Sequence, residues 1–245
     1  IMALFAIADL HLSGASDHKM DVFGPRWQDY TQKIKKNWTA VVSPEDTVVI
    51  PGDISWALTL EETKCDFAFL DSLPGKKLLG KGNHDFWWCT AAKATRFFTE
   101  NHFSSLSLLY NNAYVVEDFI VCGTRGWFLE ENQQLTVGSV DYKKIMNREL
   151  MRLKLSLQAA KLLQTGENAG KEILVFLHFP PVFRSFRSEE TLQILQQAGV
   201  RRCFFGHIHG VYTEKRENIT DGIRFTMISS DFLSFVPYRI FPEEK

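Results

Sequence analysis

Side chains of the kinds that bind metal ions or transfer protons occur side by side at Asn83, His84 and Asp85. They follow the short apolar run 77–79 and precede the aromatic residues 86–88. An amide, an imidazole and a carboxylate in consecutive positions, where a strand gives way to a loop, can point at one site. The same three residue types also form ordinary polar turns, so the interpretation depends on the residues that accompany them.

Further groups of this kind follow other short apolar runs of the chain. They are Asp9 and His11, Asp53, His178, and His207 with His209. Each run is typical of a buried strand, so these side chains are expected at the edge of a sheet. Leaving so many polar groups unpaired beneath the surface is costly, and bound divalent cations would remove that cost.

Oxygen and imidazole ligands without thiolate favour Mn, Fe or Zn over a structural cysteine-type zinc site. Mg and Ca are less suited to so many imidazoles. There are too many ligands for one tetrahedral ion, so we infer two ions that share a bridging carboxylate. Such pairs, roughly 3.5–4 Å apart, hold the attacking and departing oxygens of an in-line displacement.

Strands and helices alternate in the first half of the predicted fold, and hairpins occur in the second. Strands are predicted over residues 3–8, 47–50, 77–79, 173–177 and 202–205. Antiparallel strands are predicted over 106–110, 113–116 and 119–122, then over 211–219 and 223–229, with a last strand over 231–240. Helices are predicted over about 25–42, 59–73, 91–99, 140–164 and 189–198. This mixture predicts an α/β fold of two packed sheets with helices outside.

Composition fits one soluble domain, residues 1–245, with 45% hydrophobic and 23% charged residues. A net charge of -1 supplies no general attraction to nucleic acid or anionic membrane. The 4 cysteines lack CxxC spacing and are expected to be free and mostly buried thiols. Neither a charged leader nor an apolar run of about 20 residues is present, so we expect a cytoplasmic protein without a membrane span.

The order of these motifs resembles the calcineurin-like metallophosphoesterase superfamily, in particular its bacterial-type phosphohydrolase branch. The motifs are Asp9-x-His11, Gly52-Asp53, Gly82-Asn83-His84-Asp85, His178 and Gly206-His207-x-His209. The resemblance covers positions 9 to 209 and implies a two-sheet β-sandwich flanked by helices, a four-layer αββα fold. It implies a phosphohydrolase acting on a phosphomonoester or phosphodiester.

The resemblance also implies a role for each matching residue. One metal would be held by Asp9, His11, Asp53 and His209, and the other by Asp53, Asn83, His178 and His207. Asp53 would bridge the ions, and a hydroxide between them would be the nucleophile. His84 would stabilise developing charge or donate a proton. Asp85 would orient that imidazole or, alternatively, bind backbone amides.

Residues 54–56 depart from two branches of the family. They lack both the further Asp, Arg and Gly of the protein Ser/Thr phosphatases and the metal-binding Tyr of the purple acid phosphatases. We therefore expect a small phosphorylated substrate, with nucleotides among the candidates. Arg125, flanked by Gly123 and Gly126, is the best candidate substrate-binding residue, and Arg184 and Arg187 are weaker candidates.

Two alternatives stay open. One is a non-catalytic interaction scaffold of the same fold. The other is a nuclease, although a near-neutral chain does not favour long nucleic acid as a partner. The nuclease would gain support if a basic strip bordered the metal site, drawn from Lys33, Lys35, Lys36, Lys143, Lys144 and Arg148.

Overall fold

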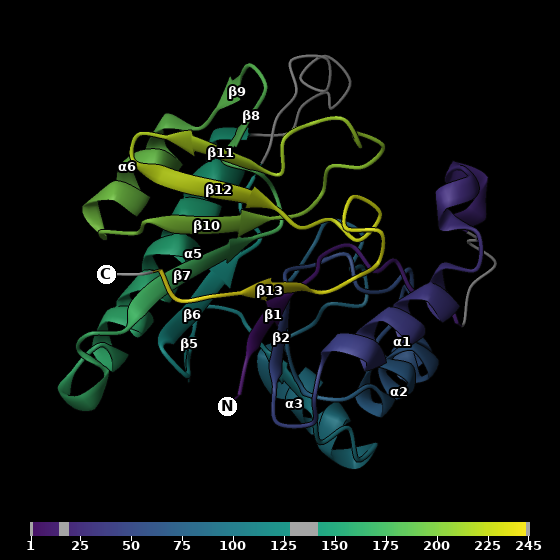
Figure 1. The fold of residues 1–245 in the computed structure, drawn as a ribbon. Coiled ribbons are helices and arrows are strands. Elements are labelled where there is room, and N and C mark those ends of the chain that lie inside the picture. Colours follow the sequence, from purple (N-terminus) through teal and green to yellow (C-terminus); the bar gives the residue numbers. More distant parts are fainter. Residues whose placement is uncertain (1, 15–19, 128–141, 244–245) are drawn as a thin grey trace.

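Two β-sheets form the centre of the molecule, and helices cover their outer faces (Figure 1). The structure is a computed structural model that describes residues 2–14, 20–127 and 142–243. Among the helices of these ranges, none has the length and apolar character that a membrane span requires. The α/β fold with two packed sheets is confirmed.

The first sheet combines N-terminal strands with one strand from the end of the chain. Its spatial order is β13 (Tyr238–Ile240), β1 (Leu4–Ala6), β2 (Thr47–Ile50), β3 (Lys76–Leu79) and β4 (Leu106–Leu108). Strands β1 to β4 run parallel, and β13 pairs with β1 in the antiparallel direction. Residues that follow β1, β2 and β3 therefore emerge at the same edge.

The second sheet is built from the later part of the chain. Its spatial order is β11 (Glu217–Thr220), β12 (Ile223–Met227), β10 (Arg202–Phe205), β7 (Glu172–Leu177), β6 (Phe119–Thr124) and β5 (Ala113–Val116). The four inner strands run parallel, and the two outer strands are antiparallel to their neighbours. A separate short hairpin joins β8 (Val182–Phe183) to β9 (Phe186–Arg187).

The helices form two outer layers (Figure 1). On the side of the first sheet lie α1 (Tyr30–Val41), α2 (Lys64–Ser72) and α3 (Ala91–Glu100). On the side of the second sheet lie α5 (Tyr142–Leu163) and α6 (Glu189–Gln197). Short 3-10 turns occur at η1 (Met20–Phe23), η2 (Pro25–Trp27), η3 (Glu61–Thr63) and η4 (Gly166–Asn168).

Strand β7 shows why the inner strands are continuous apolar runs in the sequence. Leu174 and Phe176 face the core between the sheets, where the Phe176 ring stacks on Phe204 with centroids 4.9 Å apart. The alternate residues Ile173 and Val175 face the second core, against α5 and α6. A parallel strand covered on both sides has no solvent-facing row, so it lacks the alternation of an exposed sheet.

The predicted strand over 106–110 exists but has a different partner. It was expected to form a hairpin with 113–116, whereas β4 pairs in parallel with β3 in the first sheet. The turn at Asn111 and Asn112 carries the chain from one sheet to the other, and the Asn112 side chain bonds the backbone of both Leu108 and Tyr110. The hairpin prediction was wrong because periodicity identifies a strand without identifying its neighbour.

Several other predicted helices and strands are longer than those in the structure. Asp29 has a left-handed backbone with φ 51° and separates η2 from α1, so the segment from Pro25 is not one helix. Only residues 217–219 of the predicted strand 211–219, and only 238–240 of the strand predicted from 231, lie in strands of the structure. Position 140, where the long helix was expected to begin, lies outside the described residues. Two of the four thiols are buried, Cys122 and Cys203, while Cys65 is exposed.

Candidate metal centre

Side chains from both sheets meet where parallel strands end. The link between the sheets follows β1, where the Ala8 amide donates to the Ile228 carbonyl and the Ser230 amide donates to the Ala8 carbonyl, over 2.8 and 2.9 Å. This brings Asp9 beside the loop that follows β10, whose His207 amide donates to Asp9 Oδ2 over 2.9 Å. Residues almost 200 positions apart in the sequence therefore share one site.

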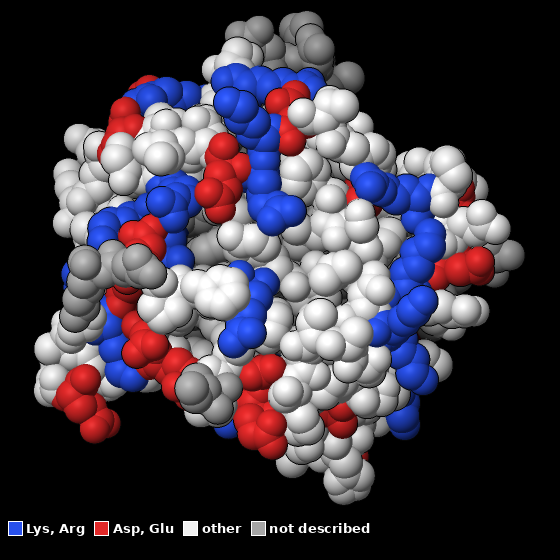
Figure 2. Space-filling view, viewed as in Figure 1, with Lys and Arg blue, Asp and Glu red and all other residues white. Residues whose placement is uncertain are grey.

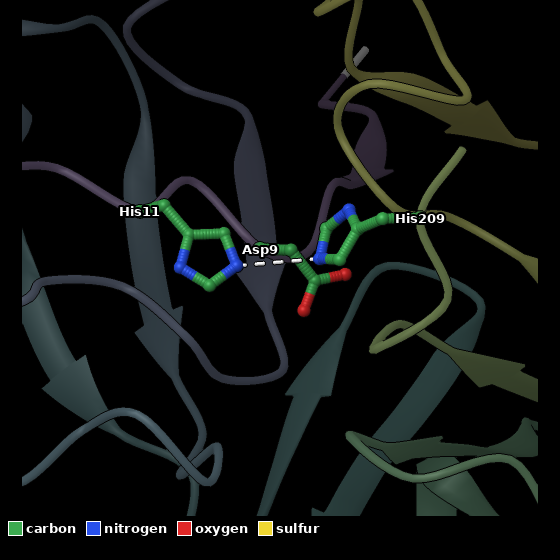
Figure 3. Close-up of side chains that lie close together, drawn as sticks. All are labelled: Asp9, His11 and His209. Carbon is green, nitrogen blue, oxygen red and sulfur yellow. Dashed lines mark hydrogen bonds between the residues drawn. The ribbon is translucent and has the colours of Figure 1, made fainter. Parts of the chain in front are cut away.

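One group of candidate ligands consists of Asp9, His11 and His209 (Figure 3). Their ligand atoms lie within 4.8 Å of one another. The two imidazoles face each other, with their Nε2 atoms 3.3 Å apart. Asp9 and His11 are buried and His209 is partly buried.

A second group consists of Asp53, His178 and His207, again with ligand atoms within 4.8 Å of one another. Asn83 is adjacent, because its Oδ1 lies 2.6 Å from His178 Nε2. Asp9 Oδ1 lies 3.4 Å from His178 Nδ1, which brings the two groups next to each other.

Asp53 is in contact with both groups. Its Oδ2 atom lies 3.7 Å from His11 Nε2 and 3.5 Å from His178 Nε2. Its other oxygen, Oδ1, accepts a hydrogen bond from the His84 amide over 2.8 Å. A single carboxylate oxygen between two ligand groups has the placement that a bridging ligand requires.

The backbone of the candidate ligands is strained. Asp9, His11, Asp53 and His207 have φ values of 61, 46, 50 and 69°, in the left-handed region that non-glycine residues rarely adopt. Such conformations cost on the order of 1–3 kcal/mol each and are concentrated at functional sites. In each case the left-handed residue lies in the segment that follows a buried strand and contributes its side chain to the shared site.

Two glycines make room for the buried carboxylates. A Cβ atom on Gly82 would lie 2.0 Å from Asp53 Oδ1, and one on Gly206 would lie 2.5 Å from Asp9 Oδ2. No side chain larger than hydrogen fits at either place without displacing a candidate ligand. The glycines of the two motifs therefore have a direct steric function.

The arrangement fits metal ions by two observations. Asp9 Oδ1, His11 Nδ1 and His178 Nδ1 are buried and have no hydrogen-bond partner among the described residues, which is costly for the protein alone. The facing nitrogen atoms of His11 and His209 are 3.3 Å apart. Two nitrogen ligands about 2.0–2.1 Å from one tetrahedral ion would be separated by about 3.4 Å.

Burial decides the protonation of these groups. It raises the pKa of Asp9 to about 7, opposed by the neighbouring His209. Burial, followed by the charges of Asp85 and Asp9, raises the pKa of Asp53 well above its usual range. Burial and the other imidazoles lower the pKa of His207 to about 3 and that of His178 well below its usual value. These two histidines are thus neutral, as ligands must be, while the carboxylates are costly to ionise until a cation is present.

His84 lies at the rim of the first group, half-buried. Its ring centroid is 4.4 Å from that of Trp56 and 5.6 Å from that of His11. Trp56 also stacks on His11, with centroids 5.1 Å apart. Burial and the nearby His209 lower the pKa of His84. Trp56 thus holds a neutral imidazole beside the ligands.

For Asp85, the structure shows the second of the two expected alternatives. Its oxygens accept hydrogen bonds from the backbone amides of Gly82, Asp53 and Ile54, over 2.7 to 2.9 Å. The Trp87 indole also donates to it, over 3.0 Å. The carboxylate therefore ties the loop after β3 to the loop after β2 and positions Asp53 and Asn83 relative to each other.

Asp231 contacts the site but was not recognised from the sequence, where it was assigned to a strand. It is buried in the turn before β13, and its Oδ1 lies 2.8 Å from His209 Nδ1. Its other oxygen accepts from the Gly210 amide and the Tyr212 hydroxyl. Burial alone would lower the pKa of His209, but Asp231 raises it. A lone aspartate distant from every motif gives no sequence signal of this contact.

The two candidate substrate-binding arginines lie in different surroundings. Arg125 is largely buried, and its backbone carbonyl accepts hydrogen bonds from the His178 and Phe179 amides over 3.1 and 2.9 Å, next to the second ligand group. Arg184 is exposed, pairs with Glu214, and lines a separate cavity of about 460 Å³. Arg187 pairs with Glu189 and Asp221. The backbone of Arg125 thus contacts the site, while its side chain pairs with Glu149. Arg184 and Arg187 pair with other acidic residues.

Comparison with known proteins identifies the family. The model of the calcineurin-like phosphoesterase family matches residues 2–211, so the chain belongs to this family. Its members are metal-dependent phosphohydrolases, and the chain is therefore an enzyme of this class that uses divalent metal ions. A comparison with curated protein sequences gives no significant match.

Solved structures share the fold at low sequence identity. Phosphopantetheinyl hydrolase (PptH) from Mycobacterium tuberculosis is 14% identical with a TM-score of 0.57, over 98% of this chain and 96% of that one. A protein of unknown function, AQ665 from Aquifex aeolicus, is 15% identical with a TM-score of 0.51 and the same coverage. TT1561 of Thermus thermophilus is 9% identical with a TM-score of 0.58, over 98% of both chains. At these identities the likeness shows the fold alone.

Proposed function

We propose that the protein is a binuclear metal-dependent phosphoesterase that hydrolyses a small phosphorylated substrate. The observation that carries this proposal is the position of Asp53 Oδ2, 3.7 Å from His11 and 3.5 Å from His178, one imidazole from each ligand group. A carboxylate shared in this way fits two ions better than one.

In this proposal each group holds one ion. Asp9, His11, Asp53 and His209 would hold the first, and Asp53, Asn83, His178 and His207 the second. When bound, the two cations, which we expect to be Mn, Fe or Zn, would supply an activated water and neutralise charge on the phosphoryl group. The remaining steps belong to side chains that do not bind metal.

His84 is proposed to act on the phosphoryl group. Because its pKa is lowered by burial, the ring is neutral near pH 7 and donates an N–H hydrogen bond to a phosphoryl or leaving-group oxygen. This favours stabilisation of charge over donation of a proton, the two roles implied by the family resemblance. Stacking against Trp56 limits the orientations that the ring can adopt.

Substitution of His84 tests this role. His84→Gln should lower kcat toward an aryl phosphate and a bis-aryl phosphodiester by about 10²–10³ while leaving Mn²⁺ affinity within a factor of a few. His102→Gln, at an exposed position, is the matched control and should keep wild-type rates. Removal of metal by a chelator should abolish both activities, and Mn²⁺ should restore them. Equal rates in the chelated and Mn²⁺-loaded enzymes would exclude the metal-dependent mechanism.

A scaffold that only retains the fold is less consistent with this site. The buried ligand atoms without partners among the described residues and the strained ligand backbone are unfavourable, and metal binding would compensate for them. A nuclease is less consistent with the net charge of -1. On the face in Figure 2, basic side chains form a strip along the right-hand edge, where α1 lies in Figure 1, and are mixed with acidic ones elsewhere.

A further inference from the structure

A buried carboxylate with an excess of arginine partners lies beside the proposed active site. Glu149, on α5, is 1% exposed, and its Oε1 accepts hydrogen bonds from Arg125 over 3.0 Å and from Arg152 over 2.7 Å. The Arg148 guanidinium lies 3.7 Å from the same oxygen. The four residues are named here the Glu149 cluster. The many charged residues of α5 are typical of a solvated helix face, yet Glu149 is buried.

One guanidinium would neutralise a buried carboxylate, yet three converge on this one. The exposed fractions of their side chains are 12% for Arg125, 25% for Arg152 and 55% for Arg148, so the positive charge extends from the interior to the surface. Bringing like charges together in a partly desolvated place is unfavourable unless an anion also binds there.

The cluster also retains unused donors. Within the part of the chain that the structure describes, Arg125 Nε and the neighbouring Trp127 Nε1 are buried and have no hydrogen-bond partner. The Arg125 guanidinium lies over the Trp127 ring, 5.1 Å from its centroid, and Arg152 lies over the Tyr110 ring at 5.2 Å. Aromatic faces of this kind hold planar guanidinium groups in place without occupying their N–H donors.

The cluster adjoins the proposed metal centre through the backbone of Arg125. The Arg125 carbonyl accepts hydrogen bonds from the amides of His178 and Phe179. The arginine cluster therefore follows directly on the strand end that carries the candidate ligand His178.

We propose that the Glu149 cluster binds a second phosphate group of the substrate, so that the enzyme acts on small molecules that carry two phosphates. This inference rests on the proposed function, since one phosphate is hydrolysed at the metals while the other is held by the arginines. Guanidinium groups match phosphate oxygens in a bidentate geometry, and Glu149 sets the orientation of two of them. Among the described residues, the three guanidinium groups face one carboxylate, and the substrate would balance the remaining positive charge.

A binding experiment without metal tests the subsite independently of catalysis. Inorganic phosphate is titrated into the chelated full-length protein at low salt and followed by calorimetry. Arg152→Gln should weaken binding about 10-fold or more, since it removes a charged hydrogen-bond donor. Arg152→Lys should weaken it less, because charge remains but the bidentate geometry is lost. The control Arg201→Gln removes an arginine that is 61% exposed at another place and should bind phosphate like the wild type.

A kinetic experiment tests the substrate class. The Mn²⁺-loaded wild type should hydrolyse glucose 1,6-bisphosphate with a kcat/KM about 10-fold or more above that for glucose 1-phosphate. This ratio should fall toward one in Arg152→Gln and persist in Arg201→Gln. Circular dichroism identifies variants that fail to fold, and the more exposed Arg148→Gln then takes the place of Arg152→Gln.

The outcomes separate the two proposals. If the enzyme hydrolyses none of these substrates, neither the sugar phosphates nor an aryl phosphate, the proposed function is contradicted. Phosphate binding to the metal-free protein would then still test whether the second-phosphate subsite exists. Unchanged phosphate affinity and an unchanged substrate ratio in both Arg152→Gln and Arg148→Gln would overturn the subsite even in an active phosphoesterase.

Discussion

Asp231 shows how a single residue outside every motif can control a candidate ligand. Its Oδ1, 2.8 Å from His209 Nδ1, fixes which nitrogen of the ring carries the proton and directs Nε2 toward His11. Carboxylates behind histidine ligands raise the basicity of the ring and hold its orientation. Asp231 itself is kept ionised, because its contacts with His209, Gly210 and Tyr212 outweigh the effect of burial on its pKa.

We therefore expect Asp231→Asn to weaken Mn²⁺ binding by about 10–100-fold while the fold is retained. Calorimetric titration of the chelated protein with Mn²⁺ provides the measurement. The pKa of His209, followed by NMR in the metal-free protein, should fall at the same time because the negative charge is lost. Asp118→Asn, at an exposed turn, should change neither quantity. Wild-type Mn²⁺ affinity in Asp231→Asn would show that the contact is only structural.

At the scale of elements, the site is built from loops that follow parallel strands of two sheets. Asp85 joins the loop after β3 to the loop after β2, since it binds the amides of Gly82 and Asp53. The loops approach so closely that Gly82 has no room for a methyl group, which would lie 2.0 Å from Asp53 Oδ1. The spacing between loops, rather than the length of any strand, therefore determines the position of the candidate bridging ligand.

Gly82→Ala should consequently displace Asp53. We expect a loss of about 1–3 kcal/mol of unfolding free energy, a lower Mn²⁺ affinity and a lower activity. Gly170→Ala is the control, because a Cβ atom there meets nothing within 4 Å. It should be neutral or slightly stabilising. Calorimetric melting curves and Mn²⁺ titrations of both variants give the comparison, and equal behaviour of the two would contradict the steric argument.

For the whole molecule, the metal site lowers the stability of the metal-free protein. Asp9 has a pKa near 7 in the folded state and 3.8 as its ordinary value. Between these values the folded protein keeps a proton that the unfolded chain releases. The contribution of Asp9 to stability is therefore present below about pH 4 and is lost as the pH rises to 7.

Asp9→Asn removes this loss of stability with rising pH, because an amide does not ionise. In chelator, the variant should match the wild type near pH 4 and exceed its melting temperature increasingly up to pH 7, by about 2–4 °C for each kcal/mol gained. The measured quantity is the difference in melting temperature between Asp9→Asn and the wild type at each pH. The histidines, whose effect on stability has the opposite pH dependence, are common to both proteins and cancel in this difference. With Mn²⁺ the order should reverse, since the wild type alone keeps the ligand. A constant difference from pH 4 to pH 7 would refute the effect.

The sequence by itself determined which residues meet at the site and which class of enzyme the chain belongs to. The candidate ligands, the glycines beside them and the ends of the strands are local features. A short segment such as Gly82 to Asp85 contains all three. The family and the two-sheet fold followed from their order along the chain and are confirmed. The expected ligands Asp9, Asp53, His178 and His209 lie together in the structure.

Tertiary structure alone decided the partners of β4, the position of Asp231 behind His209, and the burial of Glu149 among arginines. Each of these depends on contacts between segments far apart in the chain. The sequence around a charged or apolar residue does not indicate which distant residue it will contact. Glu149 reads as one more charge on a helix surface until α5 packs on the second sheet and encloses it. The chemistry of the site is therefore local in the sequence, whereas the proposed second-phosphate subsite depends on packing.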